Sequence, residues 1–188
     1  MRIVGGRHRG RALGAPRGLA IRPTSDRARE ALFNILEHGK LSSDGRSLLP
    51  GATVLDAFAG TGAFALEALS RGAAHALLIE RDPAALAAAR DNVRKLGEAG
   101  NVTIRQADAT RPGPAPAEAA IAFLDPPYRA GLAEPALGAL AREGWLAPAA
   151  IAIVELDSRE SFRAPEGFAL IDERRYGRAR LVFLRHGA

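Results

Sequence analysis

The stretch from Val54 to Ala73, VLDAFAGTGAFALEALSRGA, constrains the fold more than any other part of the chain. A short apolar run ends in an acid, a turn of small residues with Gly60 and Gly62 follows, and an apolar helical pattern comes next. This order predicts a strand, a tight turn and a helix. Glycines in such a turn let the main chain approach a ligand at the exposed amides of the helix N-terminus. Nicotinamide and flavin proteins bind pyrophosphate with a similar turn, so the turn alone leaves the ligand open.

Two acids narrow the choice of ligand. Asp56 ends the first strand, where a pyrophosphate site more naturally has a neutral residue, with a third glycine at the helix start. Glu80 ends the next apolar run, AHALLIE, 24 positions later, which is about the spacing at which α/β nucleotide sites hold a ribose diol. An acid at Asp56 suits a positively charged ligand. A cation that carries a ribose indicates S-adenosylmethionine, which has an ammonium and a sulfonium group.

The length and composition fit a single α/β domain. With 188 residues, 47% of them hydrophobic, the chain is long enough for one such domain and hardly for two. No apolar run approaches the roughly 20 residues that span a bilayer, so we expect no membrane association. The sequence contains no cysteine, which excludes a disulfide framework and a thiolate metal site. A reducing, cytoplasmic compartment and the absence of a metal are therefore expected.

A basic arm precedes this domain. Residues 1–30 hold eight arginines and two acids, a net charge of +6, whereas the whole chain has a net charge of +5. A basic arm on a near-neutral body is typical of a polyanion-binding protein, because guanidinium groups match phosphate oxygens. A solvated tail, the general bias of the chain toward arginine and an organellar transit peptide are the alternatives. Several glycines and Pro16 interrupt the arm and disfavour the amphipathic helix of a transit peptide.

Beyond the arm, strands and helices alternate, which predicts a mostly parallel sheet with helices on both faces. The first helix is capped by Thr24 or Ser25, runs to about His38, and is followed by a linker over 40–51. Five strands are predicted over 53–56, 76–80, 102–106, 120–124 and 150–155, and helices over 63–71, 83–96 and 132–143. A final pair of strands, joined by a turn at Tyr176-Gly177, requires antiparallel pairing. We therefore predict an arm and helix over 1–40 that pack on a main domain over 41–188.

The tetrapeptide Asp125-Pro126-Pro127-Tyr128 directly follows the predicted strand 120–124. The carboxyl ends of parallel strands form one sheet edge, where open α/β sheets bind their ligands. Two prolines there begin a rigid extended loop. The Asp125 carboxylate and the Pro126 carbonyl can accept both N–H bonds of one amino group, and Tyr128 can stack on a flat base, an interaction worth about 1–3 kcal/mol. The pattern favours methyl transfer to an exocyclic amine, in which proximity and charge stabilisation supply most of the rate gain.

Each of these assignments has a structural alternative. The tetrapeptide could be a tight turn that happens to contain proline, although its place beside the other acids favours a functional role. Asp108, in RQADAT, is placed to accept from the adenine amino group of the cofactor, and otherwise would be a loop acid or helix cap. Phe58 is a candidate for the methionine pocket or a core aromatic.

The same residues resemble a known group of enzymes. The segments DAFAGTG, LLIERD, QADA and DPPY resemble the class I S-adenosylmethionine-dependent methyltransferases that modify exocyclic amines. The N-terminal segments MRIVGGRHRGRAL and RPTSDRAREALFNIL resemble the bacterial 16S ribosomal RNA guanine-N2 methyltransferases of the RsmD type. This resemblance extends from Met1 to about Arg185. It implies a Rossmann-like, mostly parallel seven-stranded sheet with an antiparallel C-terminal strand.

The resemblance also implies an activity and a set of site residues. The activity is that of a monomeric enzyme that methylates the N2 amine of one guanine in 16S rRNA, on an assembling or assembled small subunit. Phe33 and Asn34 would close over the cofactor, and Asp125 to Tyr128 would hold the target base. The family usually has an aliphatic residue where this chain has Phe64, so the pocket is expected to differ locally. The cofactor site would comprise Asp56, Phe58, Gly60, Gly62, Glu80, Arg81, Asp108 and Ala109. The RNA phosphates would contact Arg2, Arg7, Arg9, Arg11, Arg22 and Arg27.

Three other functions remain possible from the sequence. A DNA or RNA adenine-N6 methyltransferase, or one acting on another exocyclic amine, would use the same catalytic set, but a DNA enzyme normally needs a sizeable target-recognition insert. A dehydrogenase would leave the loop from Asp125 to Tyr128 without a role. A non-catalytic RNA-binding assembly factor would tolerate loss of the cofactor acids, yet every expected acid is present.

Overall fold

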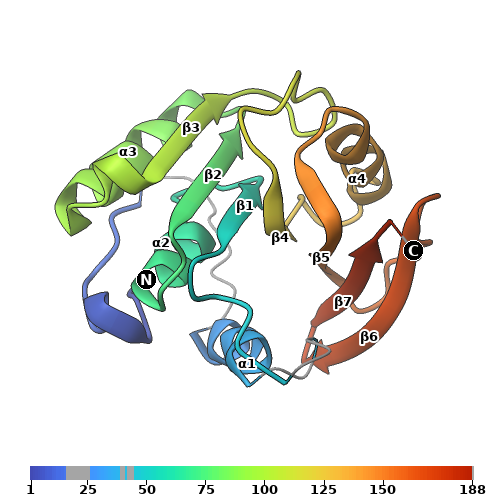
Figure 1. The fold of residues 1–188 in the computed structure, drawn as a ribbon, viewed down its shortest axis with the longest axis horizontal. Helices are drawn as coiled ribbons and strands as arrows, with labels where there is room; N and C mark the ends of the chain where they lie inside the picture. The colour runs from blue at the N-terminus through green and yellow to red at the C-terminus, as the bar shows by residue number, and fades with distance from the viewer. Residues whose placement is uncertain (16–25, 39–40, 42–44, 188) are drawn as a thin grey trace.

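A computed structural model describes residues 1–15, 26–38, 41 and 45–187. Its centre is one seven-stranded sheet with the order β3-β2-β1-β4-β5-β7-β6 (Figure 1). The strands are β1 (Thr53–Ala57), β2 (His75–Glu80), β3 (Val102–Gln106), β4 (Ala119–Leu124), β5 (Leu146–Asp157), β6 (Phe168–Tyr176) and β7 (Ala179–His186). The predicted strands are confirmed, and β5 is longer at both ends than predicted.

The sheet is parallel from β3 to β5. β1 pairs in parallel with both β2 and β4, so the strand order reverses between β1 and β4. β7 is antiparallel to both of its neighbours, β5 and β6, which confirms the predicted antiparallel pair at the end of the chain. Ligands of open α/β sheets bind in the crevice at such a reversal, at the carboxyl ends of the strands. The fold therefore marks the edge beyond β1 and β4 as the place for a site.

The helices are α1 (Asp26–Glu37), α2 (Ala63–Ser70), α3 (Pro83–Leu96) and α4 (Ala133–Arg142). Local signals define their ends: the Asp82 side chain accepts hydrogen bonds from the Ala84 and Ala85 amides at the start of α3, and Gly97 takes a left-handed conformation at its end. Figure 1 shows α1 and α2 on one side of the curved sheet and α4 on the other. Helices thus cover both faces, as predicted.

Two hydrophobic clusters follow from the alternation of side chains along the strands. Val54 on β1 and Ile121 and Phe123 on β4 belong to a cluster with α1, α2 and α3. The neighbouring Leu55 on β1 and Leu124 on β4 belong to the opposite cluster, which includes α4 and the buried Trp145. Asp56 lies between Leu55 and Ala57, so its side chain points to the face that α1 and α2 cover.

The N-terminal arm is folded back on itself and docked on α2. Arg2 and Ala12 form an antiparallel bridge around the short 3-10 helix η1 (Gly6–His8), which gives the small hairpin expected from the sequence. The amides of Val4 and Gly5 donate to the two carboxylate oxygens of Glu67 at 2.8 and 2.7 Å. A hairpin held by backbone contacts needs no particular side chains of its own at these positions.

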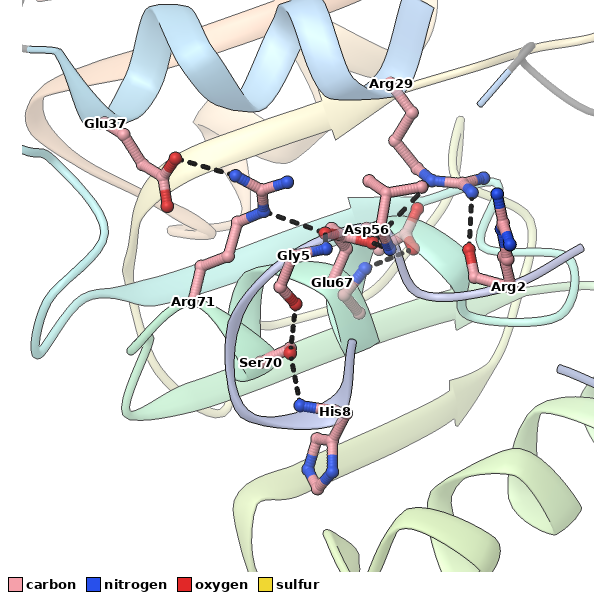
Figure 2. Close-up of polar contacts among 11 residues, drawn as sticks. Arg2, Gly5, His8, Arg29, Glu37, Asp56, Glu67, Ser70 and Arg71 are labelled. Carbon is pink, nitrogen blue, oxygen red and sulfur yellow. Dashed lines mark hydrogen bonds and ion pairs between the residues drawn. The ribbon is translucent and has the colours of Figure 1, made fainter. Parts of the chain in front are cut away.

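Glu67 is also the acceptor for buried arginines. Its side chain is fully buried, it accepts from Arg71 Nε at 2.8 Å, and it lies 3.9 Å from Arg29 Nε. Arg29 in turn donates to the Arg2 carbonyl, and Arg71 donates to Glu37 at the end of α1 (Figure 2). One buried carboxylate on α2 therefore joins the arm, α1 and α2.

Other residues of the hairpin contact the ends of α2 and α3. The Ser70 hydroxyl donates to the Gly5 carbonyl and accepts from the His8 amide (Figure 2). Arg7 and His8 both contact the buried Glu98, directly after α3. Helices that connect parallel strands run against them, so the C-terminal ends of α2 and α3 lie at the amino edge of the sheet. The η1 loop is therefore docked at the edge opposite the crevice.

The Glu67 network generates a stability prediction. Glu67→Gln removes the charge that compensates two buried guanidinium groups, so the free energy of unfolding should fall by about 3–5 kcal/mol. Urea unfolding followed by circular dichroism measures this loss. Asp91→Asn is the matched control, because it breaks the exposed Asp91–Arg94 pair on α3 and should change stability little. Equal stability losses in the two variants would contradict the importance of the buried network.

Candidate functional site

Four side chains from neighbouring strands meet at the carboxyl edge of the sheet. Ala57 of β1 is in register with Ile79 of β2 and Leu124 of β4, and Leu124 is in register with Val154 of β5. The next residue on each strand is therefore part of one row across the crevice. This row comprises Phe58, Glu80, Asp125 and Glu155.

Asp56 lies just beneath this row and is almost completely buried, with 3% of its surface exposed. Its Oδ2 accepts from the Ala65 amide in the first turn of α2 at 3.1 Å. Burial raises the pKa of Asp56 to about 8, and the nearby Glu80 charge adds to this rise, while the Ala65 hydrogen bond opposes it. A buried carboxyl of this kind gains most from a cation, because a positive ligand compensates the cost of ionising it.

The glycine turn brings the backbone to the same edge. Gly60 has a φ of +54°, and a Cβ at this position would meet no atom within 4 Å, so the main chain borders open space. Its amide donates to Glu80 Oε2 at 2.8 Å. Gly62, with a φ of +77°, lies at the start of α2, and a Cβ there would come within 3.1 Å of Leu78. Gly60 thus leaves room for a ligand, whereas Gly62 permits close packing of the helix on the sheet.

Phe58 has a positive φ of 71°, which is rare for an aromatic residue. Such a conformation costs on the order of 1–3 kcal/mol and persists only where the surroundings enforce it. The Phe58 and Ala59 amides both donate to the Ile79 carbonyl at 3.0 Å, which fixes the turn. Phe58 is half-buried and packs against the cluster on the α4 side, as the core alternative expects, and its place in a methionine pocket stays a prediction.

Glu80 is held rigidly at the end of β2. Its Oε1 accepts from the Arg81 and Asp82 amides, both at 2.8 Å, and its Oε2 accepts from Gly60. The residue is half-buried, and Arg81 beside it is exposed. A carboxylate with three backbone donors is held in one position, which suits a pair of hydroxyl donors from a sugar.

Asp108 and Ala109 follow β3 at the same edge. Asp108 Oδ1 accepts from the Thr110 hydroxyl at 2.7 Å and from the Thr110 amide at 2.9 Å. These bonds, first the hydroxyl, hold the pKa of Asp108 below its ordinary value. Ala109 is buried. One oxygen of Asp108 thus has the local hydrogen bonds expected of a loop acid. The contact of Asp108 with a cofactor adenine stays a prediction.

The loop after β4 presents the proposed base site. Asp125 is half-buried, Pro126 is buried and Pro127 is exposed. The Tyr128 hydroxyl donates to Glu155 Oε1 at 3.1 Å, which anchors the tip of the ring to β5. Asp125 and Glu155 follow paired residues on adjacent strands, so two carboxylates stand side by side at this point. The loop can therefore offer acceptors to an amine next to a fixed aromatic ring.

Phe33 and Asn34 have different surroundings from those expected of a lid. Phe33 is fully buried, stacks on Phe64 with ring centroids 5.1 Å apart, and lies under the Arg71 guanidinium at 5.0 Å. Phe64 stacks in turn on Phe123 of β4 at 4.5 Å. In this structure Phe33 is therefore a core residue. The Phe64 ring packs between Phe33 of α1 and Phe123 of β4. Asn34 is exposed, and its carbonyl accepts from His38.

Of the arginines predicted to contact RNA, Arg7 and Arg11 lie away from the crevice. Arg7 is tied to Glu98, and the Arg11 side chain donates to the Lys95 carbonyl, both at the amino edge of the sheet. Arg2 and Arg9 are exposed in the same hairpin. Arg22 lies outside the described residues, and Arg27 is part of α1.

Sequence reasoning missed the acids of β5. Glu155 and Asp157 are both nearly fully buried and both point to the face that carries Asp56, because Val154 and Leu156 belong to the opposite cluster. The signal was present, since the run IAIVELD places two acids with a period of two at the end of a strand. The role of these two acids could not be recognised from the sequence, because it depends on the register of β5 with β4.

Metal and membrane features complete the description. Among the described residues, no three His, Cys, Asp or Glu side chains are grouped so that they could hold a metal ion. Within the same residues, no helix has the length and apolarity needed to cross a membrane.

The arrangement of the sheet and its edge defines a class of protein. A seven-stranded sheet with its single antiparallel strand next to the end, a glycine turn after β1 and an acid at the end of β2 are the features of the class I methyltransferase fold. The chain belongs to the family described as "Conserved hypothetical protein 95", which it matches over residues 1–185.

Individual relatives agree with this membership. The chain is 42% identical over 159 residues to "Ribosomal RNA small subunit methyltransferase D" of Escherichia coli (strain K12), covering 82% of this chain and 74% of that protein. It is 31% identical over 181 residues to the protein of the same name from Haemophilus influenzae, covering 94% and 89%. The structure of "Putative methyltransferase yhhF from Escherichia coli" superposes with a TM-score of 0.82 and 38% identity, covering 100% of this chain and 98% of that one.

The raised pKa of Asp56 generates a prediction for the ligand-free protein. Because this pKa is higher in the folded chain than in the unfolded chain, the contribution of Asp56 to stability is full below its ordinary pKa of 3.8 and is lost as the pH rises through about 8. Asp56→Asn keeps an acceptor for Ala65 but cannot ionise. The difference in free energy of unfolding between variant and native protein should therefore grow in favour of the variant from pH 5 to pH 8.

Urea unfolding at fixed pH values between 5 and 9 measures this difference. Glu118→Gln, at an exposed position, is the control and should give a curve parallel to that of the native protein. A curve for Asp56→Asn that is also parallel would show that the Asp56 carboxyl ionises normally in its buried site.

Proposed function

We propose that the protein transfers a methyl group from S-adenosylmethionine to the exocyclic N2 amine of a guanine in 16S rRNA of the small ribosomal subunit. Membership in the family and the names of the relatives support a ribosomal RNA methyltransferase. The single observation that carries the proposal is the row at the carboxyl edge, in which Asp125, directly after β4, and Glu80, at the end of β2, lie on either side of the glycine turn that follows β1. The guanine and its N2 position come from the resemblance to the RsmD type.

The residues at this edge fit S-adenosylmethionine group by group. Asp56 offers a buried carboxyl with a raised pKa to the ammonium, and the space beside Gly60 admits the ligand close to the backbone. Glu80 suits the ribose hydroxyls, and Asp108 with Ala109 lies where an adenine would follow. When bound, S-adenosylmethionine supplies an electrophilic methyl group and becomes S-adenosylhomocysteine.

The loop after β4 orients the amine. Asp125 and the Pro126 carbonyl accept the two N–H bonds, which favours a pyramidal nitrogen with its lone pair directed at the methyl group. The new carbon–nitrogen bond forms as the sulfur–carbon bond breaks, and the nitrogen loses one proton to Asp125 or to water. A carboxylate next to the developing positive charge on nitrogen stabilises the transition state. Tyr128, held by Glu155, limits the motion of the stacked base.

The same clamp would accept the N6 amine of adenine, so adenine methylation is the second candidate. The names of the relatives favour ribosomal RNA as the substrate and do not name the base. We further propose that the protein acts as a monomer in the cytoplasm, because the residues predicted for the cofactor and the target base all come from one chain.

Asp125 provides the test of this function. Asp125→Ala removes the acceptor for the amine and should lower methyl transfer by about 10²–10³-fold or more, while cofactor affinity stays close to that of the native protein. The assay incubates labelled S-adenosylmethionine with small subunits that lack rRNA methylation and maps the modified nucleotide. Calorimetry with S-adenosylhomocysteine measures cofactor affinity.

Glu118→Gln is again the control variant and should retain both properties. Retained turnover in Asp125→Ala would remove the role assigned to this carboxylate. Label on an adenine would replace guanine with the second candidate, and absence of label from RNA would refute the proposed function.

A further inference from the structure

Two exposed arginines meet at one buried carboxylate beside the base loop. Arg129, directly after Tyr128, lies with Nη2 3.8 Å from Asp157 Oδ1, and Arg178 donates from Nη2 to Asp157 Oδ2 at 3.2 Å. The Asp157 side chain is only 3% exposed, whereas those of Arg129 and Arg178 are 62% and 77% exposed. The two cations therefore stand at the surface on a shared, fixed anchor.

The topology places this anchor at the functional edge. Asp157 is the last residue of β5, two positions after the Glu155 that holds Tyr128, and it pairs with Ala179 at the start of β7. β7 is antiparallel to β5, so the turn between β6 and β7, with Arg178, projects from the carboxyl edge. The Ser158 amide donates to the Arg178 carbonyl at 2.8 Å, which holds that turn against the end of β5.

The surroundings of the Asp157 carboxyl favour its charged form. Asp157 Oδ1 accepts from the Arg159 amide at 3.0 Å, and this bond, with the two guanidinium groups, keeps the pKa of Asp157 below its ordinary value. A second acid, Glu160, accepts from the Arg129 amide and, through its carbonyl, from Arg180. The Arg180 guanidinium also faces Glu173, and the side chains of Arg129, Arg159 and Arg178 against Asp157 and Glu160 still leave a net positive charge.

Stability alone does not account for this cluster. Ion pairs whose cations are mostly exposed contribute about 0–1 kcal/mol, so these pairs orient the arginines more than they hold the fold. Arg129 also has a positive φ of 59° at the third residue of the turn that the Ala130 amide closes on the Pro127 carbonyl. Glycine is the relaxed choice at such a position. The chain keeps a strained arginine there, next to the base loop.

We infer that Arg129 and Arg178 bind the RNA phosphates that flank the nucleotide inserted into the base loop. This inference rests on the proposed function and names the part of the protein that contacts the RNA backbone. An enzyme that acts on a base extrudes the nucleotide into its pocket, and the adjoining phosphates then lie at the mouth of that pocket. Phosphate contacts of this kind set position and register rather than sequence. Fixed guanidinium groups match phosphate oxygens in charge and shape.

The location differs from that of the N-terminal arginines. Arg7 and Arg11 are engaged at the amino edge near α3, on the side of the sheet that ends with β3. Figure 1 shows the arm beside α2 and the hairpin of β6 and β7 at the other end of the sheet. Arg129 and Arg178 therefore lie closer to the base loop than Arg7 and Arg11 do, and we assign to them the phosphates next to the target base.

The test uses Arg129→Gly and Arg178→Gln, singly and together. Glycine accepts the positive φ, so the first variant removes the guanidinium without straining the turn. Arg94→Gln is the matched control, because Arg94 is 71% exposed and paired with Asp91 on the distant α3. Fluorescence anisotropy measures binding of a labelled single-stranded oligoribonucleotide over about 50–200 mM salt, the range in which phosphate contacts dominate affinity.

Each site variant should bind RNA about 10-fold more weakly at low salt, and the slope of log affinity against log salt should decrease by about 0.7 for each lost contact. Arg94→Gln and the affinity for S-adenosylhomocysteine should stay unchanged. Urea unfolding should show that Arg129→Gly is at least as stable as the native protein. With small subunits as substrate, KM should rise more than kcat falls.

Native affinity and salt slope in both variants, or equal losses in Arg94→Gln, would overturn the inference, as would failure of the native protein to bind RNA. These outcomes are separate from the test of the methylation itself. A native protein that labels no RNA, but loses RNA binding in Arg129→Gly and Arg178→Gln, would refute the proposed function and support the binding surface.

Discussion

The parallel pairing of β1 with both β2 and β4 is the constraint on which the rest of the structure depends. It places the ends of the central strands at one edge, so that residues distant in sequence become neighbours without any contact of their own. Asp56, Glu80 and Asp125 meet there because each directly ends, or lies near the end of, an apolar strand. A shift of one residue in the register of β4 would turn Asp125 to the other face of the sheet. The hydrophobic alternation that protects this register therefore also preserves the site.

Buried carboxylates have three distinct roles in this fold, and their partners decide which. Glu67 is compensated by Arg29, Arg71 and two backbone amides, so it is a structural anchor. Asp157 is compensated by Arg129 and Arg178, whose side chains are largely exposed, so this carboxylate holds positive charge at the surface. Asp56 accepts from the Ala65 amide and lies at a site where burial raises its pKa to about 8. Ionisation of Asp56 is costly until a cation arrives, which links its burial to ligand binding.

The order of strands and helices could be predicted from the sequence because each apolar run and each cap carried a local signal, such as Asp82 and Gly97 around α3. The edge that holds Asp56, Glu80 and Asp125 followed from the parallel topology. The contacts of individual side chains could not be predicted in the same way. Phe33 was expected at the cofactor, but its ring stacks on Phe64, a non-local contact that helical periodicity cannot reveal. The acids of β5 escaped notice for a related reason, since their importance depends on the pairing of β5 with β4 and β7.

The arm shows how a charge pattern can combine two functions. Its arginine content suggested nucleic-acid binding, yet its best-defined contacts are backbone amides of Val4 and Gly5 on Glu67, which would be the same for almost any side chains. The glycines explain this, because Gly6 has a positive φ and a Cβ there would come within 1.9 Å of the Ser70 carbonyl. The sequence of the arm is thus constrained first by close docking on α2. The exposed arginines of the hairpin are placed around that constraint, whereas Arg129 and Arg178 of the β6–β7 turn lie beside the base loop.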